Sequence, residues 1–142
     1  FRSGTFAFHP ALPALLVRHG FTLDLSAAPG YADPARNVDW GTLLSPDGES
    51  IAGGGARLAE VPLAWNGRGN DLATDYLYNE KLDLDGLVGI YDAQCRASLA
   101  GGPRIVNFLT HGFGLAEPVW RRQAAAFLAH VRAAGGRILG AG

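Results

Sequence analysis

Apolar residues recur at helical spacing in two long stretches of the chain. Residues 83–99 place apolar side chains on one face behind Asp83, a residue type favoured at helix N-caps. Residues 118–134 repeat the pattern and are followed by Gly135 and Gly136, which stop a helix. We therefore predict two amphipathic helices. The inward positions would be Leu84, Leu87, Val88, Tyr91, Cys95 and Leu99 in the first, and Trp120, Ala124, Phe127, Leu128 and Val131 in the second.

A third, shorter helix is predicted over residues 10–19. Leu12, Leu15 and Leu16 share one face there, and the prolines are confined to the first turn, where a missing N–H costs nothing. Gly20 follows as the stop.

Short alternating or continuous apolar segments predict strands between these helices. Residues 21–26 alternate apolar and polar side chains, and residues 104–111 run from Ile105 through β-branched and apolar residues to His111. We expect strands over residues 1–8, 21–26, 57–63, 104–111 and from residue 137 onward. Residues 27–55 are rich in Pro, Gly, Asp and Asn and predict a long loop with a hairpin near residues 46–48.

This order of elements predicts an α/β fold with mainly parallel strands, arranged as an open sheet or a barrel, in one domain over residues 1–142. The chain has no methionine, and strand-like segments lie at both of its ends. We therefore expect it to be part of a longer domain whose N-terminal half is missing.

The amino-acid composition limits the classes of partner and the chemistry that can be expected of the chain. The net charge is −1, and the 12 basic residues are scattered, which does not favour nucleic acid as a partner. No apolar run approaches the roughly 18 residues that cross a bilayer, and no localisation signal is recognisable. The one cysteine, Cys95, lies in a helical pattern and is expected to be a small buried side chain.

Three polar residues lie at or near the ends of predicted strands: Arg2, Asp24 and His111. The carboxyl ends of parallel strands meet on one face of an α/β fold, so these side chains are expected to converge. A histidine there suits general acid–base catalysis, a carboxylate such as Asp24 would fix its tautomer, and an arginine would orient a carboxylate or a substrate oxygen.

The remaining histidines have simpler structural interpretations. His9 precedes a predicted helix and His19 closes it. His130 is expected on a solvated helix face. None of the three is expected to be a ligand.

Short motifs in a fixed order give the chain a resemblance to a known family. They are FRSGTFAF at residues 1–8, RHGF at 18–21, DLS at 24–26, PG at 29–30, EVP at 60–62 and FLTH at 108–111. Together they resemble the second half of a polysaccharide deacetylase domain, the NodB-homology or carbohydrate esterase family 4 group. The resemblance implies a distorted (β/α) barrel of the glycoside hydrolase and deacetylase type.

What this family does is hydrolyse N-acetyl or related C–N bonds with one divalent metal, so the resemblance implies the same activity and a divalent cofactor, with zinc the expected ion. The two motifs that supply the metal ligands and the catalytic base would precede Phe1. This chain alone is therefore expected to bind no metal and to be inactive.

The resemblance also implies roles for individual residues. Arg2 would pair with the catalytic base, Asp24 would set the protonation of the catalytic histidine, and His111 would be the general acid that protonates the departing amine. Leu109 would line the pocket for the acyl methyl group. Trp40 and Trp65 are candidates for a substrate-binding tryptophan.

Two alternatives stay open. The proline and aromatic residue that usually follow the family's arginine are replaced here by Ser3 and Gly4, which leaves room for a same-fold amidase, allantoinase-like, acting on a small amide. A non-catalytic carbohydrate-binding domain is the other alternative. Loop aromatics could stack on sugars there, namely Tyr31, Trp40, Trp65 and Tyr78.

Overall fold

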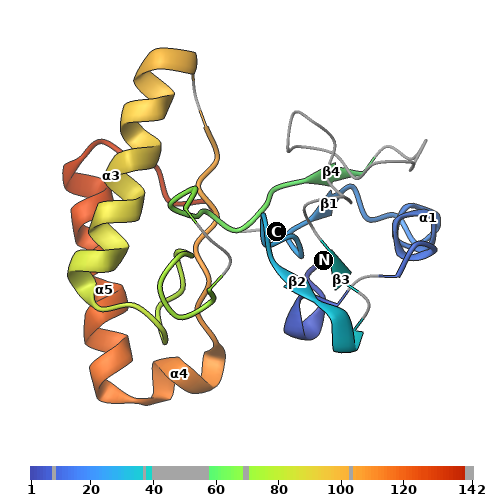
Figure 1. Cartoon of the computed structure of the whole chain (residues 1–142). Coiled ribbons are helices and arrows are strands. Elements are labelled where there is room, and N and C mark those ends of the chain that lie inside the picture. The colour runs from blue at the N-terminus through green and yellow to red at the C-terminus, as the bar shows by residue number, and fades with distance from the viewer. Residues whose placement is uncertain (8, 37, 40–57, 69–70, 103, 140–142) are drawn as a thin grey trace.

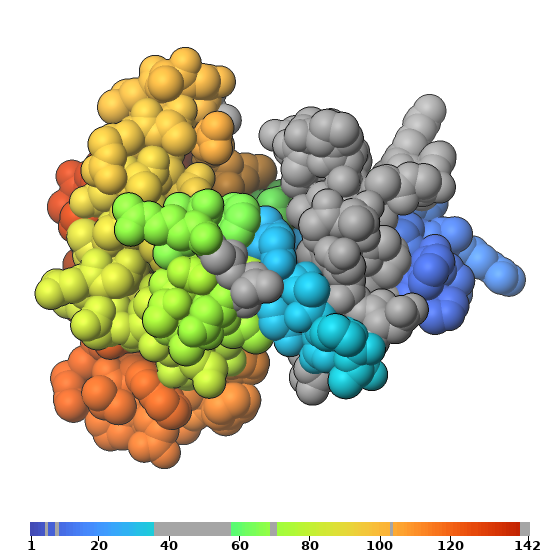
Figure 2. Space-filling model, in the orientation of Figure 1, coloured from blue at the N-terminus to red at the C-terminus, as the bar shows by residue number. Residues whose placement is uncertain are grey.

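The structure is a computed structural model that describes residues 1–142 except 8, 37, 40–57, 69–70, 103 and 140–142. Figure 1 shows the helices α3 (Leu84–Gly101), α4 (Gly112–Ala116) and α5 (Pro118–Ala133) together on one side of the molecule. Helix α1 (Leu12–Arg18) and the strands lie on the other side. In the space-filling view, residues 58–68 and 71–80 lie between the two sides (Figure 2).

The three predicted helices are confirmed. In α3, the side chain of Asp83 accepts a hydrogen bond from the backbone N–H of Gly86 at 2.8 Å, so the expected cap is present. Helix α1 ends against Gly20, whose φ of +82° suits only a residue without a Cβ, and α5 ends before Gly135, which has the same φ.

Paired strands are much shorter than predicted. β1 (Leu23–Asp24) pairs in parallel with β4 (Ala59–Glu60), so that Asp24 lies opposite Glu60. Two further antiparallel strands, β2 (Ala32–Asp33) and β3 (Val38–Asp39), flank a short 3₁₀ turn, η2 (Pro34–Arg36), inside the segment expected to be loop. The fold is mixed α/β, with parallel pairing where the site lies.

Parallel contacts extend beyond these strands as single bridges. The amino group of Phe1 donates to the carbonyl of Leu23, and the N–H of Leu25 donates back to Phe1. Farther along, Leu63 bridges Asn107 and Tyr78 bridges Leu109, both in the parallel sense. Segments that are distant in sequence are thus aligned side by side by few hydrogen bonds.

Three predicted strands are wrong among the described residues. Residues 1–8 contain a 3₁₀ turn, η1 (Gly4–Phe6), instead of a strand, and Phe6 has a φ of +57°. Residues 104–111 pair with neighbouring segments only as isolated β-bridges at 107 and 109, and Ile105 is exposed. Residues 137–139 form no strand. The hairpin expected near residues 46–48 lies outside the described residues.

Two apolar clusters form the core. One packs the N-terminal segments against later parts of the chain and contains Phe6, Ala27, Ala28, Leu63, Tyr76 and Leu109. The other joins α3 to α5 around Leu87, Tyr91 and Phe127, with Cys95 partly buried at its edge. No helix in the described part of the chain has the length and apolar character needed to cross a bilayer.

Candidate functional site

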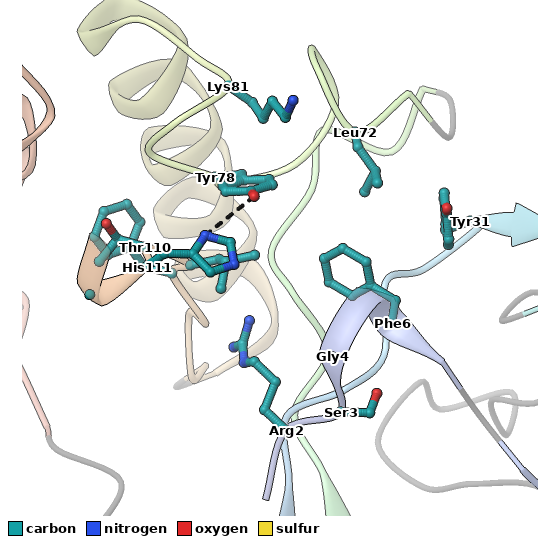
Figure 3. Close-up of a pocket in the computed structure, with 13 residues that line it drawn as sticks. Arg2, Ser3, Gly4, Phe6, Tyr31, Leu72, Tyr78, Lys81, Thr110 and His111 are labelled. Carbon is teal, nitrogen blue, oxygen red and sulfur yellow. Dashed lines mark hydrogen bonds between the residues drawn. The ribbon is translucent and has the colours of Figure 1, made fainter. Parts of the chain in front are cut away.

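A pocket of about 680 Å³ opens where the N-terminal segment meets the segments around residues 78 and 109. Figure 3 shows Arg2, Tyr78 and His111 along one wall, and Phe6, Leu72 and Tyr31 along the other. The pocket therefore has one wall that carries hydrogen-bonding groups and one that is mainly apolar. This division suits a ligand with both polar and apolar parts.

His111 reaches this pocket because the segment before it is held in place. Leu109 is buried, and its backbone donates to the carbonyl of Leu77 at 3.0 Å and accepts from the N–H of Asn79 at 2.9 Å. His111 then has extended backbone angles as the N-cap residue of α4. The imidazole is thus placed at the junction of an extended segment and a helix.

Two side chains face Nδ1 of His111. The hydroxyl of Tyr78 lies 3.3 Å from this nitrogen, and Oε2 of Glu80 lies 3.7 Å from it. Burial, and secondarily the negative charge of Glu80, raise the pKa of Tyr78, so its phenol keeps its proton. The ring of Phe113 stacks on the imidazole with centroids 4.7 Å apart, and 38% of the His111 side chain is exposed.

Glu80 is a buried carboxylate, with 6% of its side chain exposed. Its Oε1 accepts the backbone N–H of His111 at 2.8 Å and the hydroxyl of Thr110 at 2.9 Å. Gly114 of α4 lies against this carboxylate so closely that a Cβ at that position would collide with Oε1. The absence of a side chain at residue 114 is therefore what makes room for Glu80.

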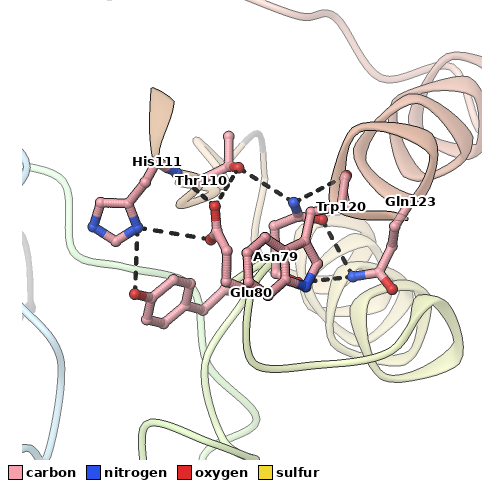
Figure 4. A network of polar contacts seen from close by, with 7 residues as sticks. Asn79, Glu80, Thr110, His111, Trp120 and Gln123 are labelled. Atoms are coloured by element: carbon pink, nitrogen blue, oxygen red, sulfur yellow. Dashed lines mark hydrogen bonds and ion pairs between the residues drawn. The ribbon is translucent and has the colours of Figure 1, made fainter. Parts of the chain in front are cut away.

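Figure 4 shows how this group is tied to α5. The fully buried Asn79 donates to the hydroxyl of Thr110 at 3.3 Å and to the carbonyl of Trp120 at 3.1 Å. Gln123 donates to the backbone carbonyl of Asn79 at 2.8 Å and also to that of Leu82. Buried polar networks of this kind fix side-chain geometry when their members are satisfied.

Arg2 comes from the opposite end of the chain. Its Nη2 donates to Oδ1 of Asn107 at 2.7 Å, and Asn107 in turn donates to the carbonyl of Val61 at 2.8 Å. Burial lowers the pKa of Arg2, while Glu60 and Asp24 favour its charged form. A guanidinium stays protonated in such surroundings, so the pocket wall carries a positive charge.

Two buried acids lie behind Arg2. Asp24 is 0% exposed, and its Oδ1 accepts the hydroxyl of Ser26 at 2.5 Å. Ser26 also accepts the N–H of Ser3 at 2.8 Å, which ties the Arg2 segment to β1. Glu60 is 2% exposed, and burial raises its pKa to about 8, with the Ala27 N–H and Arg2 opposing and Asp24 reinforcing the rise.

The predicted residues converge in part. Arg2, Leu109 and His111 line the same pocket, as expected. Asp24 makes no hydrogen bond or ion pair with His111, and the acid beside that ring is Glu80. Asp24 lies on β1 behind Arg2, so its expected role at the imidazole stays a prediction.

Trp65 is not among the described residues that line the pocket. The ring of Trp65 stacks on that of Tyr76, with centroids 6.0 Å apart, and packs against the first core cluster. Trp40 lies outside the described residues. Of the other aromatic residues considered for sugar stacking, Tyr31 and Tyr78 do line the pocket.

His130 does not lie on a freely solvated face. Its Nε2 is 2.8 Å from Oδ1 of Asp92, and its ring meets that of Tyr91 edge to face. The contact joins α5 to α3, and the helical pattern alone could not show that two polar residues would meet across these helices. His19 is the C-cap residue of α1, as expected, and Nδ1 of His9 accepts the N–H of Ala11.

Three residues of the site were not predicted, namely Glu60, Glu80 and Asn107, and Tyr78 was considered only as an aromatic residue that could stack on a sugar. The alternation of Tyr76, Leu77 and Tyr78 is a short strand-like signal that could have placed Glu80 at the end of an extended segment. Glu60 stands in the EVP motif, but a carboxylate opposite Asp24 is visible only from the pairing of β1 with β4.

The described residues bring no three His, Cys, Asp or Glu side chains together as a metal site. Comparison with protein-family models, curated proteins and solved structures found no match.

Proposed function

We propose that this chain contributes the general-acid side of an enzyme that hydrolyses the amide C–N bond of an N-acetylated sugar or glycan. The observation that carries the proposal is the pocket that Arg2 lines together with Leu109 and His111, which lie 107 and 109 positions later in the chain. The motif resemblance names the same three residues for this chemistry.

The pocket supplies what the departure of an amine requires. An amine leaves a tetrahedral intermediate readily only after protonation, and His111 can deliver a proton to it from Nε2 while the C–N bond breaks. Arg2 adds a positive charge and free donor capacity, since its Nη1 is buried without a hydrogen-bond partner. Leu109 offers an apolar contact for an acyl methyl group.

A divalent metal, zinc by resemblance, would activate the water that attacks the carbonyl. The described residues include no group of three His, Cys, Asp or Glu side chains that could hold this metal. We propose that the ligands and the base belong to a segment preceding Phe1, and that the intact domain is a distorted (β/α) barrel. The parallel contacts around β1 and β4 support this arrangement.

The substrate class can be tested with the longer protein that this proposal implies. We expect it to release acetate from N-acetylchitooligosaccharides in the presence of zinc, and to act much more slowly on small linear or cyclic amides. If small amides are hydrolysed faster than N-acetylchitooligosaccharides, the substrate is a small amide and not a glycan. Tight sugar binding without turnover would instead identify a carbohydrate-binding domain and overturn the proposal.

A further inference from the structure

Glu80, the acid beside His111, has one carboxylate oxygen that is hydrogen-bonded and one that is not. Oε1 of Glu80 accepts two hydrogen bonds, from the backbone of His111 and from Thr110. Oε2 is buried and has no hydrogen-bond partner, and it faces Nδ1 of His111 at 3.7 Å. A small rotation of the half-exposed imidazole would shorten this distance to that of a hydrogen bond.

We propose that Glu80 is the positioning residue of His111: its Oε2 accepts a hydrogen bond from Nδ1–H and so leaves Nε2 as the nitrogen that exchanges a proton with the substrate. The catalytic meaning of this arrangement rests on the proposed function. The arrangement itself is a property of this chain and can be tested without any assay of activity.

Glu80 is well placed for this task because its own position is fixed. It is held by the backbone of the residue that it orients and by the adjacent Thr110, and Thr110 is in turn held by Asn79. Gly114 leaves space for the carboxylate. An immobile carboxylate can select one tautomer and one orientation of an imidazole.

Tyr78 offers the competing arrangement, in which its hydroxyl donates to Nδ1 and the proton of the neutral ring lies on Nε2. Energetics favour Glu80. A buried carboxylate oxygen without a donor is costly, whereas the hydroxyl of the half-buried Tyr78, at the wall of an open pocket, can turn to other partners.

The two arrangements predict opposite tautomers, which ¹⁵N NMR of imidazole nitrogens distinguishes. In the wild-type chain at a pH where His111 is neutral, we expect the proton on Nδ1. The signals of His111 are identified by their loss in His111→Gln. A proton on Nε2 in the wild-type chain would overturn the proposal, and this result needs no other variant.

Glu80→Gln gives a sharper test. The amide oxygen must keep accepting the N–H of His111, so the amide nitrogen replaces Oε2 and presents a donor to Nδ1. We therefore expect the tautomer to switch to Nε2–H. Tyr78→Phe should retain Nδ1–H, and so should Glu117→Gln, which changes an exposed glutamate that makes no capping hydrogen bond. A tautomer that responds to Tyr78→Phe but not to Glu80→Gln would assign the role to Tyr78.

In the active longer protein, Glu80→Gln should lower kcat by up to about 10⁴-fold, the range of general acid–base catalysis, with little change in KM. If the wild-type protein hydrolyses the amide but its neutral His111 carries the proton on Nε2, the role of Glu80 is refuted and the proposed function is not. Conversely, a protein with the predicted tautomer and no amide hydrolysis would refute only the proposed function.

Discussion

Burial of Glu60 opposite Asp24 makes the stability of this chain depend on pH. A carboxyl pair that shares few partners in a dry environment is best accommodated when one member keeps its proton, and burial indeed raises the pKa of Glu60 to about 8. A protonated Glu60 adds no negative charge beside Asp24 and the positive Arg2. Charge balance behind the pocket wall therefore depends on a proton held by Glu60.

The sign of the pH effect follows from the two states of the chain. Below the ordinary pKa of 4.5, Glu60 is protonated whether the chain is folded or unfolded. Between 4.5 and about 8, only the folded chain keeps the proton, so the free energy of unfolding falls as the pH rises through this window. We expect Glu60→Gln, which mimics the protonated form, to flatten this decline in urea unfolding at pH 5 and pH 8.

The matched control is Glu117→Gln, since Glu117 is exposed. It should retain the wild-type decline. If Glu60→Gln lost stability between pH 5 and pH 8 as steeply as the wild-type chain, the buried carboxyl would not be the cause.

The short helix α4 packs directly against the site. Its N-cap residue is His111, and its Gly114 lies against the carboxylate of Glu80. A five-residue helix has little stability of its own, so its position depends on these contacts and on the start of α5 directly after it.

We predict that Gly114→Ala displaces Glu80 and lowers the free energy of unfolding by about 1–3 kcal/mol, because a buried carboxylate would lose its donors. Gly112→Ala is the matched control in the same helix, since a Cβ there would meet no atom within 4 Å. It should change the free energy of unfolding by less than about 0.5 kcal/mol. Equal effects of the two substitutions in urea titrations would contradict this account of Gly114.

The helices were predictable and the strands largely were not, for a physical reason. Helices α3 and α5 repeat their apolar positions over four or more turns, which leaves an unambiguous periodicity. β1 and β4 pair over two residues each, too few for alternation to define their ends. The short helix α4 has five residues, little more than one turn, which is too short for a periodicity to be recognised.

The site residues also differ in whether the sequence could predict them. Arg2, Leu109 and His111 were predicted because each belongs to a recognisable local motif. Glu80 was missed because its significance depends on contact with a residue 31 positions away, and Asp24 was assigned to His111 because sequence order cannot tell which of several acids lies nearest.

For the molecule as a whole, the described residues form a pocket with one polar and one mainly apolar wall. A catalytic zinc site takes about three protein ligands, and the described part of the chain gathers no such set. We therefore predict that calorimetric titration of this chain with Zn²⁺ shows no tight stoichiometric binding. Tight binding at one ion per chain would show that the ligands lie within this sequence and would contradict the proposed division of the site.

The most direct test of the central claim is the effect of His111 on acetate release. In the longer protein with zinc, acting on N-acetylchitooligosaccharide, His111→Ala should lower kcat by about 10²–10⁴-fold with KM little changed, because the departing amine loses its proton donor. His19→Ala, which removes the exposed C-cap side chain of α1, should leave kcat at the wild-type value. Wild-type kcat in a folded His111→Ala variant would contradict the assignment of the general acid to this residue.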